Sequence, residues 1–580
     1  MGIQQFGVKV FYLLGDEAAS KREIEIGVPR DLEDLRDGLA QEYTIVKPEG
    51  IAFQTPVHTP LHTLEDVLAC STHIAITIDG CPVRDPRSGP MLPLVGNYYE
   101  LYPDHLGNHQ RLFKKYGRVI KTNAMGRINY LTDDPEITEI AYKENHGLFT
   151  KQTSDSNHPL YGIRDNTALF TCDTNCDSFK LTHKFIPPSM SPKAVKHYTP
   201  IMQETVNKAF PVFDQLDKAG LAFNVYQYMV KLSGQTLCRF VLGIDAHHFD
   251  SVSSGLHPIM ILLTRILELN KAVQTRGDWY GKLPFGPPKQ LQHTRLEIAS
   301  VVDDLIDTCP RGGTEDLPLN EAALNASCLV DYLTRATDDK GDKLPYDLVL
   351  TNTLSILGAG FTTISALLAW LLYCVVTYEG NQDRLLQELV DYGVNEKTDL
   401  YPELVDSMPF LDSFIKEVMR LHSPAFQAGR NSLKDMILPG GYRLPKGAIL
   451  IPNFPAIHTN NAHWSSPHRF NPDRWNTDEV KSRHKAAYLP FAMGPRGCIG
   501  YNYALQQIKI LLPSLVYRYH WENVSPDAVE YDPEFQVIRP LNVYARAMKR
   551  TEWPQPTPKS AGSETAADVQ IDAAAVAGQS

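Results

Sequence analysis

The sequence has no surplus of positive charge. Its 580 residues include 56 Lys and Arg against 67 Asp and Glu, and the formal net charge is -11. Proteins that bind nucleic acid usually carry a basic footprint, because they must neutralise phosphate groups. The composition therefore excludes nucleic acid as an expected partner.

Cysteine is also scarce, and its spacing follows no disulfide pattern. The nine cysteines are scattered and odd in number, which indicates a reduced compartment with one functional thiolate. We expect Cys172 and Cys176 to be unpaired thiols.

The sequence lacks the marks of a secreted or anchored chain. The N-terminal residues MGIQQFGVKVF include no basic region, long apolar core or small-residue cleavage site, so we expect neither a signal peptide nor a transmembrane anchor. Charged residues are absent from Leu348 to Tyr378, a stretch that is long enough to span a bilayer. A long helix through the middle of a large core is equally apolar, and we predict a core helix here.

Residues 1–85 are predicted to form a small separate module. FGVKVFYLL and REIEIGV resemble strands, Asp31 caps a helix that carries Leu35 and Leu39 on one face, and IAFQT and HIAITIDG supply further strands. The order strand, strand, helix, strand, short helix, strand resembles a β-grasp (ubiquitin-like) domain. Such a domain usually binds another protein. The alternative is a packing cap on the rest of the chain.

Composition divides the remainder into three parts. Residues 86–97 are rich in Pro and Gly and are predicted to be a linker. Residues 98–551 form the main domain. Residues 552–580 are rich in Ala, Pro, Thr and Ser with few large apolar groups, so we expect them to be disordered.

The most specific motif is FAMGPRGCIG, which precedes a predicted helix. Glycines on both sides of a cysteine let the backbone approach a flat ligand closely and adopt positive φ angles. The start of the helix favours an anionic sulfur, and an arginine offers a fork of donors to a carboxylate. The motif resembles F-x-x-G-x-R-x-C-x-G, the haem-binding signature of the cytochromes P450, at every fixed position: Phe491, Gly494, Arg496, Cys498 and Gly500.

This resemblance implies roles for these residues. Cys498 would be the thiolate ligand of the haem iron, Arg496 would bind a haem propionate, and Phe491 would pack beside the cofactor. Arg430, in AFQAGRN, occupies the position of a second propionate arginine. His183 stands where the family has Arg or His facing a propionate, although the family's usual Trp is here Phe179.

The segment AGFTT resembles the family's A-G-x-D/E-T, which lies over the iron. Ala359 and Gly360 would loosen the helix there, and the Thr363 hydroxyl would assist proton delivery to dioxygen. The acidic residue of the motif is missing because Thr362 takes its place. This departure leaves the route of proton delivery open.

Two further motifs point to a buried ionic network. KEVMR places Glu417 and Arg420 one helical turn apart, where their side chains can meet. FNPDRW supplies Arg474 as the third member of the network found in this family. An acid between two arginines stays charged in a core only when it is paired. The alternative is an exposed helical ion pair.

The resemblance covers about residues 90 to 550 and implies the cytochrome P450 fold, which is mainly α with small β-sheets. It implies haem b as cofactor and a monooxygenase that inserts one oxygen atom of dioxygen into an apolar substrate: fatty-acid-like, polyketide or terpenoid. Fungal secondary metabolism is the expected setting. The location is expected to be cytoplasmic or peripheral at the endoplasmic reticulum. The alternatives are a haem-thiolate isomerase, dehydratase or peroxygenase, or a non-catalytic haem-binding interaction protein.

Three further expectations concern partners and surfaces. A separate diflavin NADPH reductase would dock on a basic patch formed by Lys180, Lys184 and the segment KSRHK, residues 481–485. Arg127 and Tyr130 lie on a hairpin where similar fatty-acid hydroxylases hold a substrate carboxylate, with surface placement as the alternative. Removal of residues 1–85 is expected to leave haem incorporation intact, because the module is predicted to have its own core.

Overall fold

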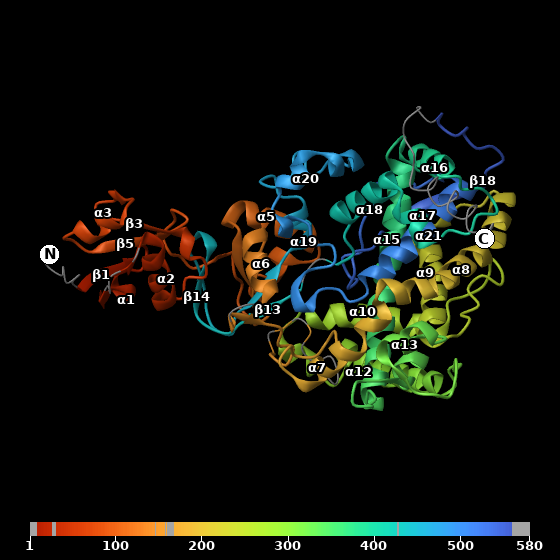
Figure 1. Cartoon of the computed structure of the whole chain (residues 1–580), viewed down its shortest axis with the longest axis horizontal. Coiled ribbons are helices and arrows are strands. Elements are labelled where there is room, and N and C mark those ends of the chain that lie inside the picture. The colour runs from red at the N-terminus through yellow and green to blue at the C-terminus, as the bar shows by residue number, and fades with distance from the viewer. Residues whose placement is uncertain are drawn as a thin grey trace, which may run out of the picture.

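The structure is a computed structural model, and it describes residues 8–25, 29, 31–144, 147–156, 158, 160, 167–425 and 428–558. A small N-terminal body lies at one end of an elongated molecule, and a larger, mainly helical body forms the rest (Figure 1). The hairpin that contains β14 (Met436–Leu438) extends from the large body toward the small one.

The N-terminal body is a five-stranded sheet with the order β2-β1-β5-β3-β4 and one main helix. The central strands β1 and β5 are parallel, and the other neighbours are antiparallel. The predicted elements occur in the predicted order, with the short helix α1 and the strand β4 in addition, and the β-grasp assignment stays an interpretation of that order. The elements are β1 (Val8–Leu13), α1 (Glu17–Ser20), β2 (Arg22–Glu25), α2 (Leu32–Tyr43), β3 (Ile51–Gln54), β4 (Pro60–Leu61), α3 (Leu64–Ala69) and β5 (Ile74–Ile78).

Helix α2 begins where the sequence places it. The Asp31 side chain accepts hydrogen bonds from the backbone N–H groups of Glu33 and Asp34, both at 2.9 Å. These bonds satisfy donors that the first helical turn leaves free. Leu35 and Leu39 are buried on the face that covers the sheet.

The core of the module is a hydrophobic cluster of its own, to which one buried residue from outside the module is added. Ile437, on β14, is buried among the module residues Phe11, Leu39 and Ile76. The module therefore has the core of its own that the sequence predicts, apart from this one residue of the hairpin. The sequence could not show the addition of Ile437, because a single apolar residue in a distant hairpin gives no signal of where it packs.

A six-stranded mixed sheet joins the module to the helical body. Its order is β6-β7-β8-β16-β13-β9, and residues 87–88 of the predicted linker form its edge strand. The segment 86–97 is therefore partly sheet and not a free spacer. The strands are β6 (Arg87–Ser88), β7 (Val119–Ala124), β8 (Arg127–Thr132), β9 (Phe149–Thr150), β13 (Arg430–Ser432) and β16 (Ile449–Pro452).

Helices make up most of the large body. They are α4 (Tyr98–Leu101), α5 (His105–Tyr116), α6 (Pro135–Lys143), α7 (Asp177–Phe185), α8 (Pro192–Lys218), α9 (Val225–Leu242), α10 (Pro258–Gln274), α11 (Asp278–Gly281), α12 (Gly286–Asp307), α13 (Leu319–Asn325), α14 (Leu329–Arg335), α15 (Tyr346–Thr377), α16 (Asn381–Asp391), α17 (Pro402–Asp406), α18 (Pro409–Leu421), α19 (Phe454–His458), α20 (Asp478–Ser482) and α21 (Tyr501–Arg518).

Three small sheets complete the body. The first has the order β10-β18-β17, and the other two are the pairs β11-β12 and β14-β15. Their strands are β10 (Phe223–Asn224), β11 (Leu317–Pro318), β12 (Ala336–Thr337), β15 (Tyr442–Leu444), β17 (Tyr519–Asn523) and β18 (Tyr544–Lys549), together with β14.

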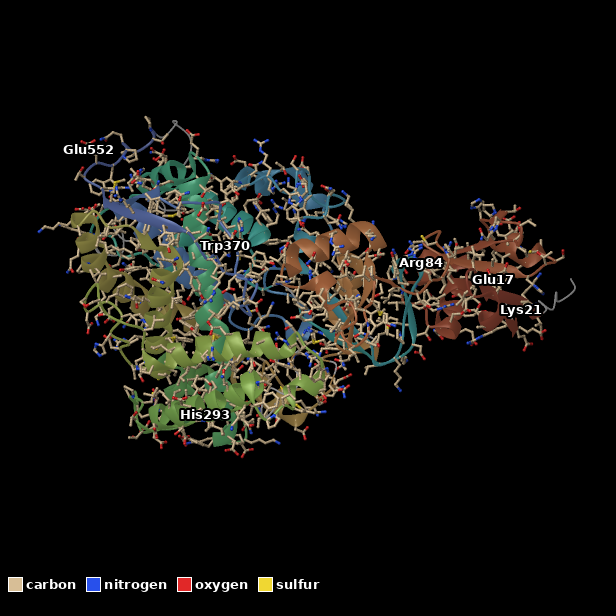
Figure 2. The ribbon with its side chains drawn as sticks, turned by 180° about the vertical axis from the view of Figure 1, so that it is seen from behind. Glu17, Lys21, Arg84, His293, Trp370 and Glu552 are labelled. Carbon is tan, nitrogen blue, oxygen red and sulfur yellow. The ribbon has the colours of Figure 1, made fainter. Side chains whose placement is uncertain are left out.

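Helix α15 is the core helix that the uncharged stretch predicts. Among the described residues it is the one helix long and apolar enough to cross a membrane, and 72% of its most apolar window is buried inside the protein. It packs against α9, α12, α18 and α21. Trp370, labelled in Figure 2, lies on this helix inside the body.

The first residues of the predicted disordered tail are ordered. The Trp553 indole stacks on Tyr517 with ring centroids 5.6 Å apart, and the backbone N–H of Thr557 donates to the Asp391 carboxylate at 2.7 Å. The prediction of disorder is therefore wrong for residues 552–558. Residues 559–580 lie outside the described residues.

Candidate functional site

The Cys498 turn lies between the short 3-10 helix η7 (Gly494–Arg496) and α21. The backbone N–H of Cys498 donates to the Phe491 carbonyl at 2.9 Å, which closes the turn. Burial raises the pKa of the Cys498 thiol, and the backbone N–H of Gly500 acts in the opposite direction. The side chain nevertheless remains accessible. A thiolate here requires a strong partner, such as a metal cation, to offset the desolvation.

Glycine occurs at the two positions that flank this turn for different physical reasons. Gly494 has φ +74°, and a Cβ on it would lie 1.9 Å from the Tyr142 carbonyl oxygen, so the fold itself requires glycine. Gly500 has φ -89°, and a Cβ there would meet no atom within 4 Å. Protein packing does not explain Gly500, whereas a flat group lying against the turn would.

Helix α15 carries the AGFTT segment, only part of which is accessible. Ala359 is exposed, while Phe361 is fully buried. The Thr363 hydroxyl donates to the Ala359 carbonyl at 2.7 Å. Thr362 is 1% exposed, and its hydroxyl has no hydrogen-bond partner among the described residues. Gly360 lies against α9, where a Cβ would come within 3.2 Å of Leu237.

Glu417, Arg420 and Arg474 are brought together in the core, so the alternative of an exposed helical pair is wrong. Arg420 donates twice to the Glu417 carboxylate, at 2.9 Å each, and Arg474 Nε donates to it at 3.0 Å. The Trp475 indole N–H and the Asn471 backbone N–H also donate to this carboxylate, at 3.1 and 2.9 Å. The remaining guanidinium donors reach backbone carbonyls.

A second buried cluster gathers three cations. Arg430 is 1% exposed, its Nε lies 2.8 Å from the Glu144 carboxylate, and its Nη2 has no hydrogen-bond partner among the described residues. Arg496 donates to the carbonyls of Leu169 and Cys172 at 3.0 and 2.9 Å.

Lys151 is the third cation, and the sequence reasoning missed it. Its ammonium donates to the Phe170 carbonyl. Burial, followed by the charges of Arg496 and Arg430, holds its pKa well below the usual value. Its only signal in the sequence is a lysine next to a short strand, which is not specific. Among the described residues, these three basic side chains have one carboxylate partner, Glu144, and such an excess of positive charge suits a ligand with two carboxylates.

His183 is not part of this buried cluster. Its ring is exposed and lies 5.1 Å from the ring of Phe179, which in turn lies 4.3 Å from the Arg496 guanidinium carbon. His183 therefore contacts the cluster only through Phe179, and its propionate role stays a prediction. Phe491 is half-buried near Tyr501, with ring centroids 6.3 Å apart.

Cys172 and Cys176 are free thiols, as expected. Cys172 is buried and lies 3.9 Å from an Arg496 nitrogen. Cys176 caps α7, because its sulfur accepts the Phe179 backbone N–H at 3.4 Å. Among the described residues, no group of three or more His, Cys, Asp or Glu could hold a metal ion. The candidate iron ligand stays the thiol of Cys498, which the motif resemblance implies.

The predicted basic docking patch is not a patch. Lys180 pairs with Asp177 at 3.1 Å, Lys184 with Asp338 at 2.9 Å and Lys481 with Asp478 at 2.9 Å. Arg483 stacks on Trp464, with its guanidinium carbon 3.6 Å from the ring centroid. Figure 1 places α7, with Lys180 and Lys184, far from α20, with Lys481. Neutralised and dispersed charges cannot form the predicted surface.

Arg127 is buried and not on the surface. It is 6% exposed, one of its terminal nitrogens donates to the Gln274 carbonyl at the end of α10, and its Nε has no partner among the described residues. Tyr130 lies three positions further along β8, so the two side chains project to opposite faces of the strand. The pairing of Arg127 with Tyr130 around one carboxylate is therefore wrong.

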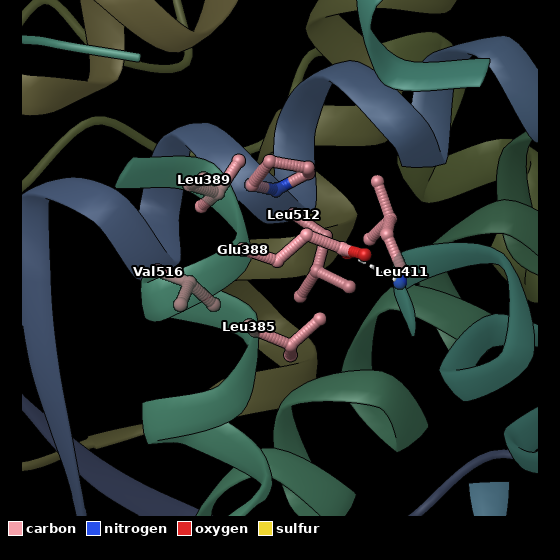
Figure 3. Close-up of a pocket in the computed structure, with 7 residues that line it drawn as sticks. Leu385, Glu388, Leu389, Leu411, Leu512 and Val516 are labelled. Atoms are coloured by element: carbon pink, nitrogen blue, oxygen red, sulfur yellow. Dashed lines mark hydrogen bonds between the residues drawn. The ribbon is translucent and has the colours of Figure 1, made fainter. Parts of the chain in front are cut away.

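A crevice elsewhere in the body is unrelated to this site. Figure 3 shows it between α16, α18 and α21, and it has no room for a water molecule. Its one charged residue, Glu388, accepts the backbone N–H groups of Phe410 and Leu411 at 2.7 and 2.8 Å. Glu388 thus caps the start of α18, and the crevice is a packing feature.

Comparisons with known proteins agree with this geometry. The sequence model of the family described as Cytochrome P450 matches residues 86–544. The "Cytochrome P450 monooxygenase alnD" of Emericella nidulans is 53% identical over 555 residues, which cover 95% of this chain and 100% of that protein. The unmatched part is shorter than residues 1–85, so the similarity extends into the N-terminal module.

More distant relatives and a solved structure give the same picture of the fold. "Cytochrome P450 4F2" of Homo sapiens is 25% identical over 359 residues, or 61% of this chain and 68% of that protein. The crystal structure of the "cytochrome P450DA heme domain" superposes with a TM-score of 0.69 at 22% identity, covering 81% of this chain and 98% of that chain.

Proposed function

Since the chain belongs to the cytochrome P450 family and is a monooxygenase, we propose that it binds haem b through Cys498 and oxygenates an apolar substrate of secondary metabolism. The substrate is fatty-acid-like, a polyketide or a terpenoid. Electrons come from a separate diflavin NADPH reductase, and the protein is cytoplasmic or peripheral at the endoplasmic reticulum. The similarity to a fungal monooxygenase along nearly the whole chain supports this setting.

The residues present fit a haem. Cys498 would ligate the iron from a turn whose Gly500 leaves room for a flat group. Arg430, Arg496 and Lys151 would pair with its two propionates. When bound, the haem supplies the oxidising chemistry, and a thiolate ligand favours cleavage of the O–O bond. The protein supplies position, charge and protons.

Proton supply is assigned to hydroxyls of α15. The Thr363 hydroxyl donates a hydrogen bond to the Ala359 carbonyl in this structure, and rotation about χ1 would turn the hydroxyl toward the accessible face of the helix. The neighbouring Thr362 cannot supply a carboxyl proton. Its unpartnered, buried hydroxyl is the one polar group that stands where the family motif has an acid.

The observation that carries the proposal is the Cys498 turn, in which an accessible thiol is followed two residues later by a glycine that the protein's own packing does not require. The test is the spectrum of the purified, reduced protein with carbon monoxide, which should show the red-shifted Soret band of thiolate ligation. Deletion of the gene should accumulate the substrate, and that metabolite should shift the spin state of the protein. A reduced protein without the band would refute haem-thiolate ligation.

A further inference from the structure

One long bent hairpin connects the candidate haem site to the N-terminal module. Its base is β13 paired with β16, where Arg430 lies opposite Leu450. Its distal part is β14 paired with β15, and residues 439–441 form the tip. Arg430 is thus carried at the base of the same hairpin whose tip reaches the module (Figure 1).

The module grips this tip on both sides. The backbone N–H of Val46 donates to the Ile437 carbonyl, and the Ile437 N–H donates to the Thr44 carbonyl, both at 3.0 Å. The Gly440 N–H donates to an Asp79 carboxylate oxygen at 2.9 Å. The Ile437 side chain is 5% exposed and lies in the module core.

Arg84, which is labelled at the junction in Figure 2, binds the other edge of the hairpin tip. Its N–H donates to the Gly441 carbonyl at 2.8 Å, and its own carbonyl accepts the Arg443 N–H at 2.9 Å. The Arg84 guanidinium carbon lies 4.5 Å from the centroid of the Tyr442 ring. Gly441 has φ +79°, and a Cβ on it would lie 2.6 Å from the Pro82 carbonyl oxygen. Any side chain at this position would clash, so the contact between the tip and the module is closely packed and specific.

A second attachment reaches the partner of Arg430. Lys47 of the module pairs with Glu136 at 2.6 Å. Glu136 lies in the first turn of α6, and Glu144 directly follows the last residue of that helix. Glu144 is the carboxylate that pairs with Arg430. The module therefore contacts the far ends of both elements that carry this buried ion pair.

We propose that the N-terminal module is a structural part of the cofactor site, because it clamps the β14-β15 hairpin and α6 and so fixes Arg430 and Glu144 for the propionates. The inference depends on the proposed haem binding. A buried cation holds a ligand well only when its own position is fixed before binding. Ile437 and Lys47 are positioning residues that act through Arg430 and Glu144.

The first test uses Lys47 in the full-length haem protein. Lys47→Glu should increase the rate of haem transfer to excess apomyoglobin by about two- to fivefold, the range expected for loss of one partly exposed ion pair. Arg22→Glu is the matched control, because Arg22 pairs with Glu42 within the module and away from the clamp. The double variant Lys47→Glu/Glu136→Lys should restore slow transfer.

The second test separates clamping from general stability. Ile437→Ala and Ile306→Ala remove the same atoms from buried sites, but Ile306 lies at the end of α12 and far from the module. Both should lower the melting temperature, and only Ile437→Ala should speed haem transfer. Ile437→Val should restore the slow rate. If Ile437→Ala fails to fold, the Lys47 series decides.

Haem transfer at the wild-type rate in both Lys47→Glu and Ile437→Ala would overturn the clamp, as would equal acceleration by Ile306→Ala. A wild-type protein that binds no haem would instead refute the proposed function. Removal of residues 1–85, which the sequence predicts to leave haem incorporation intact, is now expected to accelerate haem loss.

Discussion

Two buried ionic clusters of this protein, one around Glu417 and one around Arg430, both pair arginine with glutamate. They differ in how many of their polar atoms have a hydrogen-bond partner within the protein. Around Glu417, both carboxylate oxygens and every guanidinium nitrogen of Arg420 and Arg474 have protein partners. Around Arg430, Glu144 pairs with Arg430 alone, Lys151 and Arg496 donate to backbone carbonyls, and Arg430 Nη2 has no partner among the described residues. The first cluster is closed and holds the fold, whereas the second is open and suits an anionic ligand.

The largest expected effect is at Cys498, two residues from Arg496 of the open cluster. Cys498→Ser should abolish the red-shifted Soret band of the reduced protein with carbon monoxide, because a neutral hydroxyl is a poor substitute for a thiolate ligand. Cys172→Ser, which alters a buried thiol beside Arg496, should keep the band. A Cys498→Ser protein that retains it would show that another residue ligates the iron.

A substitution in the closed cluster should lower the stability of the fold. Glu417→Ala leaves Arg420 and Arg474 buried without their carboxylate, and should lower the free energy of unfolding by about 3–5 kcal/mol. Glu403→Ala, which breaks the exposed pair with Lys196, should cost at most about 1 kcal/mol. Denaturant unfolding of the two variants checks the difference, and equal costs would mean that burial of the network is unimportant.

Low pH should also reduce the stability of the fold, through His422, which lies two residues from Arg420 of the closed cluster. Burial, and then the charge of Arg420, lower the pKa of His422 to about 3, while a free histidine titrates near ~6.5. The folded state therefore holds His422 neutral, and its stabilising contribution is complete above about pH 6.5 and is lost as the pH falls toward 3.

His422→Phe should therefore flatten the acid side of the stability profile by up to about 1.4 kcal/mol per pH unit between those limits. The control is His183→Phe, an exposed position. Urea unfolding at pH 7.5 and pH 5 measures the slope. Identical slopes for His422→Phe and the wild type would contradict the assignment.

A substitution of Lys151 should change the stability of the protein in the direction opposite to Glu417→Ala. Lys151→Met removes a buried basic side chain that lies near the guanidinium groups of Arg430 and Arg496, and should stabilise the haem-free protein by about 1–2 kcal/mol. The same change should weaken haem binding, because a propionate loses a partner. Unfolding of the haem-free protein and haem titration measure the two effects, with Lys193→Met as an exposed control. Loss of stability in the haem-free protein would show that the open cluster is balanced after all.

The smallest effect on stability is expected at Thr363. Thr363→Ala should leave folding and substrate binding unchanged, since the hydroxyl bonds only to the Ala359 carbonyl of its own helix. NADPH consumption should continue while product formation falls, because the proton donor is removed. Product and NADPH are measured together, and unchanged coupling would assign proton transfer to Thr362 or to water.

Local spacing allowed much of this protein to be predicted. The five fixed residues of the Cys498 turn lie within ten positions, Glu417 and Arg420 lie one helical turn apart, and Asp31 stands directly before its helix. In each case the physical cause, a turn, a helix period or a cap, acts over a few residues. The family, the fold class and the candidate thiolate therefore followed from the sequence alone.

The tertiary structure alone decided where distant residues meet. Lys151 joins Arg430 and Arg496 across 279 and 345 positions of the chain, the lysines of the predicted basic patch find acidic partners, and Ile437 enters the module core. None of these contacts has a period or a spacing in the sequence. They arise because burial selects any side chain of suitable size and charge that the packed backbone brings within reach.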